Sequence, residues 1–152
     1  MRCIVALALS VVLGSCASGP QGEGEPPYIA RMKPVPEGQS RIYLLANIPA
    51  RLTIRNDCVL FTALDGKLVL PVFERTVTAG RDGEGPWIHD AISDARFRDG
   101  DRIDAGGGSS GEGVADLRKR RVLIDHVPER CINAMTRDAA PVINPGMQHA
   151  RP

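Results

Sequence analysis

Apolar residues along this chain fall into short runs that are separated by glycine, proline and aspartate. Runs with a period of two, or rich in β-branched and aromatic residues, are typical of half-buried strands. The runs expected to form strands are 41–46, 51–55, 58–64, 67–73, 102–105 and 121–127. The sequence therefore predicts a mainly β fold, either a small antiparallel barrel or a sandwich.

Two segments predict short helices beside these strands. Apolar residues in 86–97 recur near helical spacing, and Pro86 suits a first helical turn, although a strand–turn–strand is an alternative for this segment. Pro128 begins a second short helix that carries Cys131. We thus expect one or two helices in the domain.

The Asp65-Gly66 pair predicts a hairpin between two of the strands. A two-residue loop at this pair would place Phe61 opposite Leu70. Both faces of the hairpin would then be largely apolar, as in the interior of a sandwich or barrel. Pro71 cannot donate a ladder hydrogen bond, so we expect its part of the strand at an edge or a bulge.

The amino-terminal run has the features of a secretion signal. A basic residue, Arg2, precedes the apolar segment 4–13, which is shorter than the ~20 residues of a membrane span. The run ends on Leu13-Gly14-Ser15-Cys16, which resembles the lipobox of bacterial lipoproteins. The resemblance implies cleavage before Cys16 and acylation of that residue. Ala17, in the next position, resembles the corresponding residue of lipoproteins that are sent to the outer membrane. An ordinary cleaved signal is the alternative.

These features predict the domain organisation. The expected parts are a signal peptide (1–15), an acylated flexible tether (16–40), a small β-rich domain (41–135) and a mobile tail (136–152). Proline and glycine among polar residues predict the tether, and proline without periodicity predicts the tail.

Charge and composition narrow the classes of partner. The chain has 19 basic and 18 acidic residues, a formal net charge of +1 that falls to zero when Arg2 is removed with the signal. This balance gives no reason to expect a nucleic-acid partner. The basic run Arg118–Arg121 could touch lipid head groups or a polyanion, but runs of this length are usually solvated faces.

The cysteines predict a disulfide. With Cys16 acylated, Cys58 and Cys131 are the two that remain in an exported chain, and exported proteins enter an oxidising compartment. A bridge between them would tie the carboxy-terminal helix to the hairpin and close a long loop, which stabilises by roughly 4 kcal/mol in the chain-entropy model.

Three further patterns favour structural roles over chemistry. Gly106–Gly111 satisfies G-x-G-x-x-G, but no proper helix follows, so we interpret 106–113 as a flexible surface loop. The Asp99, Asp101 and Asp104 set is expected to form a solvated turn, with a Ca²⁺ site as the alternative. His89 with Asp90, and His126 with Asp125, would need Ser93 or Ser109 nearby to act as a hydrolase.

The expected function follows from the anchor more than from the domain. We expect a lipoprotein of the bacterial cell envelope that is tied to the membrane at Cys16. We do not expect an enzyme, since no catalytic residue, cofactor or metal is predicted. Its domain would be an accessory or binding module with an envelope protein as partner. The alternatives are a small envelope hydrolase using His89 or His126 and a Ca²⁺-dependent binding module.

Overall fold

The structure is a computed structural model that describes residues 24–109 and 111–151, so the predicted leader and Cys16 lie outside the described residues. Within this part the elements are β1 (Ala30–Arg31), β2 (Ala46–Arg55), β3 (Cys58–Thr62), β4 (Leu68–Val69), β5 (Val72–Phe73), β6 (Val77–Asp82), β7 (Gly85–Asp90), β8 (Ala95–Arg98), β9 (Arg102–Gly108), α1 (Val114–Arg120), α2 (Glu129–Ala134), β10 (Val142–Ile143) and β11 (Gln148–His149). Neither helix is long and apolar enough to cross a membrane.

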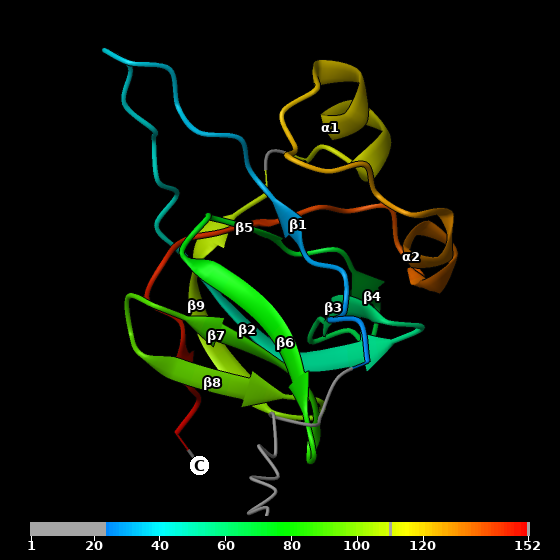
Figure 1. The fold of residues 1–152 in the computed structure, drawn as a ribbon. Coiled ribbons are helices and arrows are strands. Elements are labelled where there is room, and N and C mark those ends of the chain that lie inside the picture. Colours follow the sequence, from blue (N-terminus) through cyan, green and yellow to red (C-terminus); the bar gives the residue numbers. More distant parts are fainter. Residues whose placement is uncertain (1–23, 110, 152) are drawn as a thin grey trace, which may run out of the picture.

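The strands form two sheets, which confirms the predicted mainly β sandwich with short helices (Figure 1). The larger sheet has the order β1-β5-β10-β9-β2-β3-β4, with β11 also paired to β9. It is mixed rather than purely antiparallel, because β5 lies parallel to both β1 and β10. The smaller sheet is antiparallel, in the order β6-β7-β8.

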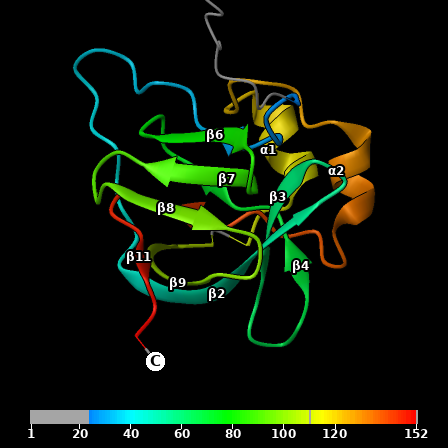
Figure 2. The same cartoon turned by 60° about the horizontal axis from the view of Figure 1, so that its bottom comes forward.

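The large sheet separates two cores. On one face it packs against the three-stranded sheet, and on the other against the two helices (Figure 2). Val59 and Phe61 of β3 face the first core, whereas Cys58 and Leu60 face the second, because successive side chains of a strand point to opposite faces. This confirms the prediction of a hairpin that is apolar on both faces.

The hairpin register differs from the prediction by one residue. The loop has three residues, since the Ala63 N–H donates to the Lys67 carbonyl at 2.9 Å and only Gly66 takes a positive φ, of 76°. Phe61 therefore pairs with Val69 instead of Leu70. A shift of one residue exchanges the faces of a strand, so Val69 joins the sandwich core and Leu70 joins the helix side. Pro71 falls between β4 and β5, as its missing N–H requires.

The predicted helix in 86–97 is wrong. The segment forms the strand–turn–strand alternative: β7 and β8 pair antiparallel and are joined by a turn in which Asp94 has a φ of 54°. Ile88 and Phe97 point inward and are fully buried, whereas their neighbours in each strand point outward. The apparent helical spacing arose because two short period-two patterns are placed one after the other.

The folded part begins earlier than the predicted boundary at residue 41. β1 pairs with β5, and isolated bridges join Tyr28 to Cys58 and Met32 to Leu123. Ile29 and Ala30 are buried. The stretch 24–32 of the expected flexible tether therefore belongs to the domain. Its backbone pairs with other segments, and Ile29 and Ala30 lie in the first and second core, respectively.

Segment 41–46 is not the expected strand. β2 begins only at Ala46, and Ile42 and Leu45 are 87% and 92% exposed. β2 also runs through Pro49, which pairs with Asp104 of β9 before pairing with β3 begins at Arg51. The strand has no neighbour on its other side at Pro49, so the missing N–H costs no ladder bond.

The carboxy-terminal region also differs from the prediction. Residues 121–127 form only the isolated Met32–Leu123 bridge instead of a strand, while the expected helix after Pro128 is present as α2. The expected mobile tail instead adds β10 and β11 to the large sheet and buries Ile143 and Met147. Short paired strands of two residues are too brief to show periodicity in the sequence.

Asp90 holds this carboxy-terminal segment in place. The residue is fully buried, and its Oδ2 accepts the N–H groups of Gly146 at 2.7 Å and Met147 at 2.9 Å. Its Oδ1 accepts the N–H of Ile92 at 2.9 Å. Three backbone donors thus satisfy one buried carboxylate. They link the β7–β8 turn to the residues directly before β11.

We expect Asp90→Asn to lower the free energy of unfolding by about 1–3 kcal/mol, because the amide replaces one acceptor oxygen with a donor that faces backbone N–H groups. Asp94→Asn is the matched control: the same chemical change at a side chain that is 95% exposed should stay within about 0.5 kcal/mol. Urea denaturation of both variants measures the difference, and equal stabilities would contradict the role of Asp90.

Candidate functional site

The two cysteines of the domain lie together, as predicted. Cys58 at the start of β3 and Cys131 in α2 form a disulfide with a Cα–Cα distance of 5.5 Å across a sequence separation of 73. Both residues are fully buried in the core between the large sheet and the helices. The bridge therefore ties the helix layer to the central hairpin.

The predicted histidine–aspartate pairs do not form. His89 points outward from β7 while Asp90 points inward, and the His89 Nε2 lies 3.0 Å from Asp94 Oδ1 instead. His126 lies between the two helices, with its Nε2 3.4 Å from the Arg118 guanidinium, while Asp125 pairs with Arg31. The two histidines thus sit on different layers with different partners.

Neither candidate serine completes a hydrolytic arrangement. Among the described residues, Ser93 Oγ has no hydrogen-bond partner, and Ser109 Oγ accepts the N–H of Gly111. No hydrogen bond joins either serine to His89 or His126 in that part of the chain. The residues named for the hydrolase alternative are therefore not brought together.

The three aspartates around Gly100 support the chain instead of gathering around an ion. Asp99 Oδ1 accepts the N–H of Ile54 at 2.7 Å, and Asp101 Oδ2 accepts that of Arg98 at 2.8 Å. Asp104 lies within β9, opposite Pro49. No group of three or more His, Cys, Asp or Glu with metal-binding geometry occurs among residues 24–109 and 111–151.

The glycine run is not the flexible loop that the sequence predicts. Gly106, Gly107 and Gly108 are the end of β9, and the last two are buried. A Cβ on Gly107 would overlap the Val142 carbonyl of β10, and one on Gly108 would overlap Leu44. These glycines therefore allow neighbouring backbone and side chains to approach closely. They lie within a strand and do not form the strand-to-helix turn that a dinucleotide-binding motif needs.

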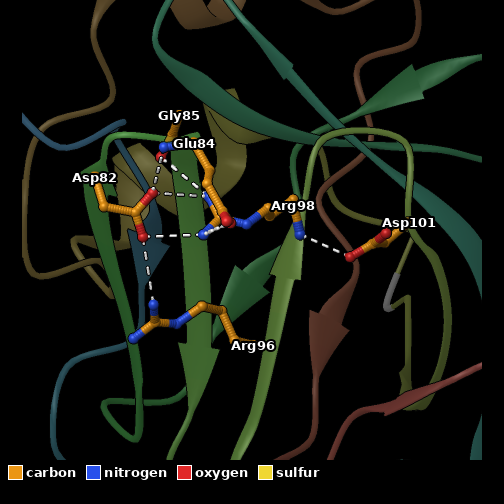
Figure 3. Close-up of polar contacts among 6 residues, drawn as sticks. All are labelled: Asp82, Glu84, Gly85, Arg96, Arg98 and Asp101. Atoms are coloured by element: carbon orange, nitrogen blue, oxygen red, sulfur yellow. Dashed lines mark hydrogen bonds and ion pairs between the residues drawn. The ribbon is translucent and has the colours of Figure 1, made fainter.

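A polar network covers one end of the three-stranded sheet (Figure 3). Arg98 of β8 donates from Nη1 and Nη2 to the two carboxylate oxygens of Asp82, at 3.0 and 2.9 Å, and also pairs with Glu84 at 2.8 Å. The hydrogen bonds from Arg98 lower the pKa of Asp82, and Asp82 in turn raises the pKa of Arg98. The network fixes the β6–β7 turn to β8.

Trp87, the one tryptophan of the chain, lies beside this network. Its ring packs over Gly80 of the neighbouring strand, and the Arg96 guanidinium lies 4.3 Å from the ring centroid, in a cation–π contact. Its Nε1 has no hydrogen-bond partner among the described residues. Sequence analysis missed this face because the helix predicted for 86–97 separates residues that the two strands bring together.

A cleft of about 540 Å³ opens on another side, where β1, β6 and the segment before α2 meet. Its polar lining includes Tyr28, Arg31, Thr78, Asp125 and Arg130. Arg31 and Asp125 form an ion pair at 3.3 Å across the cleft wall. Because this region was assigned to the tether, the sequence alone did not indicate a cleft here.

Two donors in this cleft lack partners. The Tyr28 hydroxyl and the Arg31 Nε are inaccessible to water and make no hydrogen bond within the described part of the chain. Desolvation, with the nearby charge of Asp125 as the second cause, raises the pKa of Tyr28 to about 12, so the hydroxyl stays protonated at neutral pH. Buried donors without partners are rare, and these two lie behind the cleft wall rather than on its surface.

No protein-family model matches the chain, and neither a curated protein nor a solved structure matches it.

We expect Gly80→Ala to destabilise the domain by about 1–3 kcal/mol and to change the fluorescence of Trp87, because a Cβ at this position overlaps the indole ring. Gly83→Ala is the control, since a Cβ there meets nothing within 4 Å. Thermal unfolding and tryptophan fluorescence would measure both effects. An unchanged emission spectrum in Gly80→Ala would show that the indole does not lie over Gly80.

Proposed function

We propose that this chain is an exported lipoprotein, anchored at Cys16 to the bacterial cell envelope and facing the periplasm from the outer membrane, whose domain is a non-enzymatic binding module. The observation that carries the proposal is the apolar run that ends on Leu13-Gly14-Ser15-Cys16. One acyl chain gives only marginal membrane binding, so several chains at one residue suit a stable anchor.

The disulfide supports export. Disulfides persist in oxidising compartments such as the periplasm and are rare in reducing ones. Cys58 and Cys131 are both inaccessible to solvent and join two layers of the fold, so the bridge has a structural position rather than a redox-active one. The periplasm, which the leader predicts as the destination, is thus a compartment in which this disulfide would persist.

The cleft at Tyr28 supports a binding role. Its lining includes Arg130, which is exposed and makes no ion pair among the described residues, beside the Arg31–Asp125 pair. A partner that presents carboxylate or carbonyl oxygens would accept hydrogen bonds from the Arg130 guanidinium. The cleft also lies next to the amino-terminal end of the folded part, close to the proposed tether.

The reach of the tether limits where a partner can be. Gly24, the first described residue, lies eight positions after Cys16, and a fully extended chain spans at most ~3.3–3.6 Å per residue. The first residue of the described part would thus stay within about 30 Å of the bilayer surface. Partners of the cleft are therefore expected to be envelope proteins at the membrane.

The anchor is tested with Cys16→Ser in the producing bacterium. We expect the protein to move from the membrane fraction to the soluble fraction, or to remain uncleaved, and to incorporate no labelled fatty acid, because the serine hydroxyl cannot form the thioether. Cys3→Ser is the control, since Cys3 lies in the segment expected to be removed. Fatty-acid label retained by Cys16→Ser would refute the anchor.

The binding role is tested by photo-crosslinking in intact cells. A benzophenone amino acid at position 130, on the rim of the cleft, should give adducts of discrete mass. The same group at the exposed position 55, which is outside the cleft, is the control. Identical adducts at both positions, or none at position 130, would contradict a partner in the cleft.

A further inference from the structure

The basic run in α1 forms part of a positively charged hollow. A cavity of about 260 Å³ is lined by Lys33, Leu117, Arg118, Arg121, Leu123, Ile124, Asp125 and His126. The cavity adjoins the Tyr28 cleft, with Asp125 in the wall of both. It is not used by the proposed cleft partner, and it collects charges from three segments of the chain.

Backbone pairing brings Lys33 to this hollow. The Lys33 N–H donates to the Val122 carbonyl at 2.8 Å, and the Ile124 N–H donates to the Arg31 carbonyl at 2.8 Å. These bonds flank the Met32–Leu123 bridge, so 31–33 runs antiparallel to 122–124. A lysine far away in the sequence is thereby placed beside the end of α1.

The positive charges of the hollow are not neutralised by the protein. Among the described residues, the side chains of Lys33, Arg118 and Arg121 make no ion pair with a carboxylate, and the hydrogen-bond partner of the Arg118 side chain is the His126 ring, at 3.4 Å. The one carboxylate in the lining, Asp125, is paired with Arg31 at 3.3 Å. The hollow thus carries three guanidinium or ammonium groups without a carboxylate of their own.

Helix stabilisation accounts for only part of this arrangement. Basic residues in the last turn of a helix interact favourably with its carbonyl end, which explains Arg118, Lys119 and Arg120 in a helix as short as α1. It does not explain Lys33, which comes from a different segment. Arg120 pairs with Glu112, and neither Lys119 nor Arg120 belongs to the lining.

We propose that this hollow is a binding site for a phosphate group, either of a membrane lipid or of a free phosphate compound. Three donors of fixed positive charge suit the several oxygens of a phosphate, and the guanidinium groups of Arg118 and Arg121 offer planar pairs of N–H donors. The volume lies below the ~300–1,000 Å³ usual for small-molecule pockets, which suits a compact group. The partly exposed Ile124 at the rim adds an apolar contact.

The test uses the full chain purified in a non-ionic detergent and compares two variants with the same loss of charge. Lys33→Gln with Arg121→Gln removes two cations of the hollow. Arg55→Gln with Lys67→Gln removes two exposed cations outside it. Each protein is titrated with inorganic phosphate by calorimetry, at constant ionic strength set with chloride, and with nanodiscs that contain phosphatidylglycerol or only phosphatidylcholine.

The site predicts roughly fivefold weaker binding for each charge removed from the hollow, and no more than a small change in the matched control. Saturable binding of inorganic phosphate supports a free phosphate compound as the ligand, and binding of phosphatidylglycerol nanodiscs alone supports a lipid. Equal losses in the two double variants, or no binding in either arm, would overturn the proposal. The inference goes beyond the tethered module and does not depend on acylation, so failure of the Cys16 experiment leaves these titrations interpretable.

Discussion

The burial of β3 on both faces is the constraint on which the remainder of the fold depends. From Cys58 to Phe61 every side chain is almost completely excluded from water, and neighbours alternate between the two cores. A strand of this kind is stable only when a layer covers each face. The three-stranded sheet provides one layer and the helices the other, and the disulfide holds the helix layer to β3 by a covalent bond.

Local signals in the sequence predicted the elements whose causes are local. The Asp65-Gly66 pair marked the hairpin, Pro128 marked the start of α2, and Pro71 marked an interruption of its strand. The pairing of Cys58 with Cys131 followed from the compartment and from elimination rather than from geometry. Each of these inferences depended on a residue type whose backbone or redox chemistry restricts what it can do.

Features set by distant parts of the chain could not be predicted in this way. The predicted hairpin register was wrong by one residue because the same turn signal suits loops of two and of three residues. Only the pairing of Phe61 with Val69 decides between them. The helix predicted for 86–97 failed because two consecutive strand patterns imitate helical spacing. β1, β10 and β11 have two residues each, so their partners and not their sequences determine them.

The same distinction applies to charge, and it links the fold to the surface that we assign. Net charge near zero argued against an electrostatic partner, and the run Arg118–Arg121 alone resembled a solvated face. Folding divides that run: Arg120 pairs with Glu112, while Arg118 and Arg121 line the same cavity as Lys33. Lys33 arrives there only because the segment 24–33, which lacks any strand periodicity, pairs with the sheet and with 122–124. A local surplus of charge can therefore arise in a neutral chain, because tertiary pairing and not composition determines which charges become neighbours.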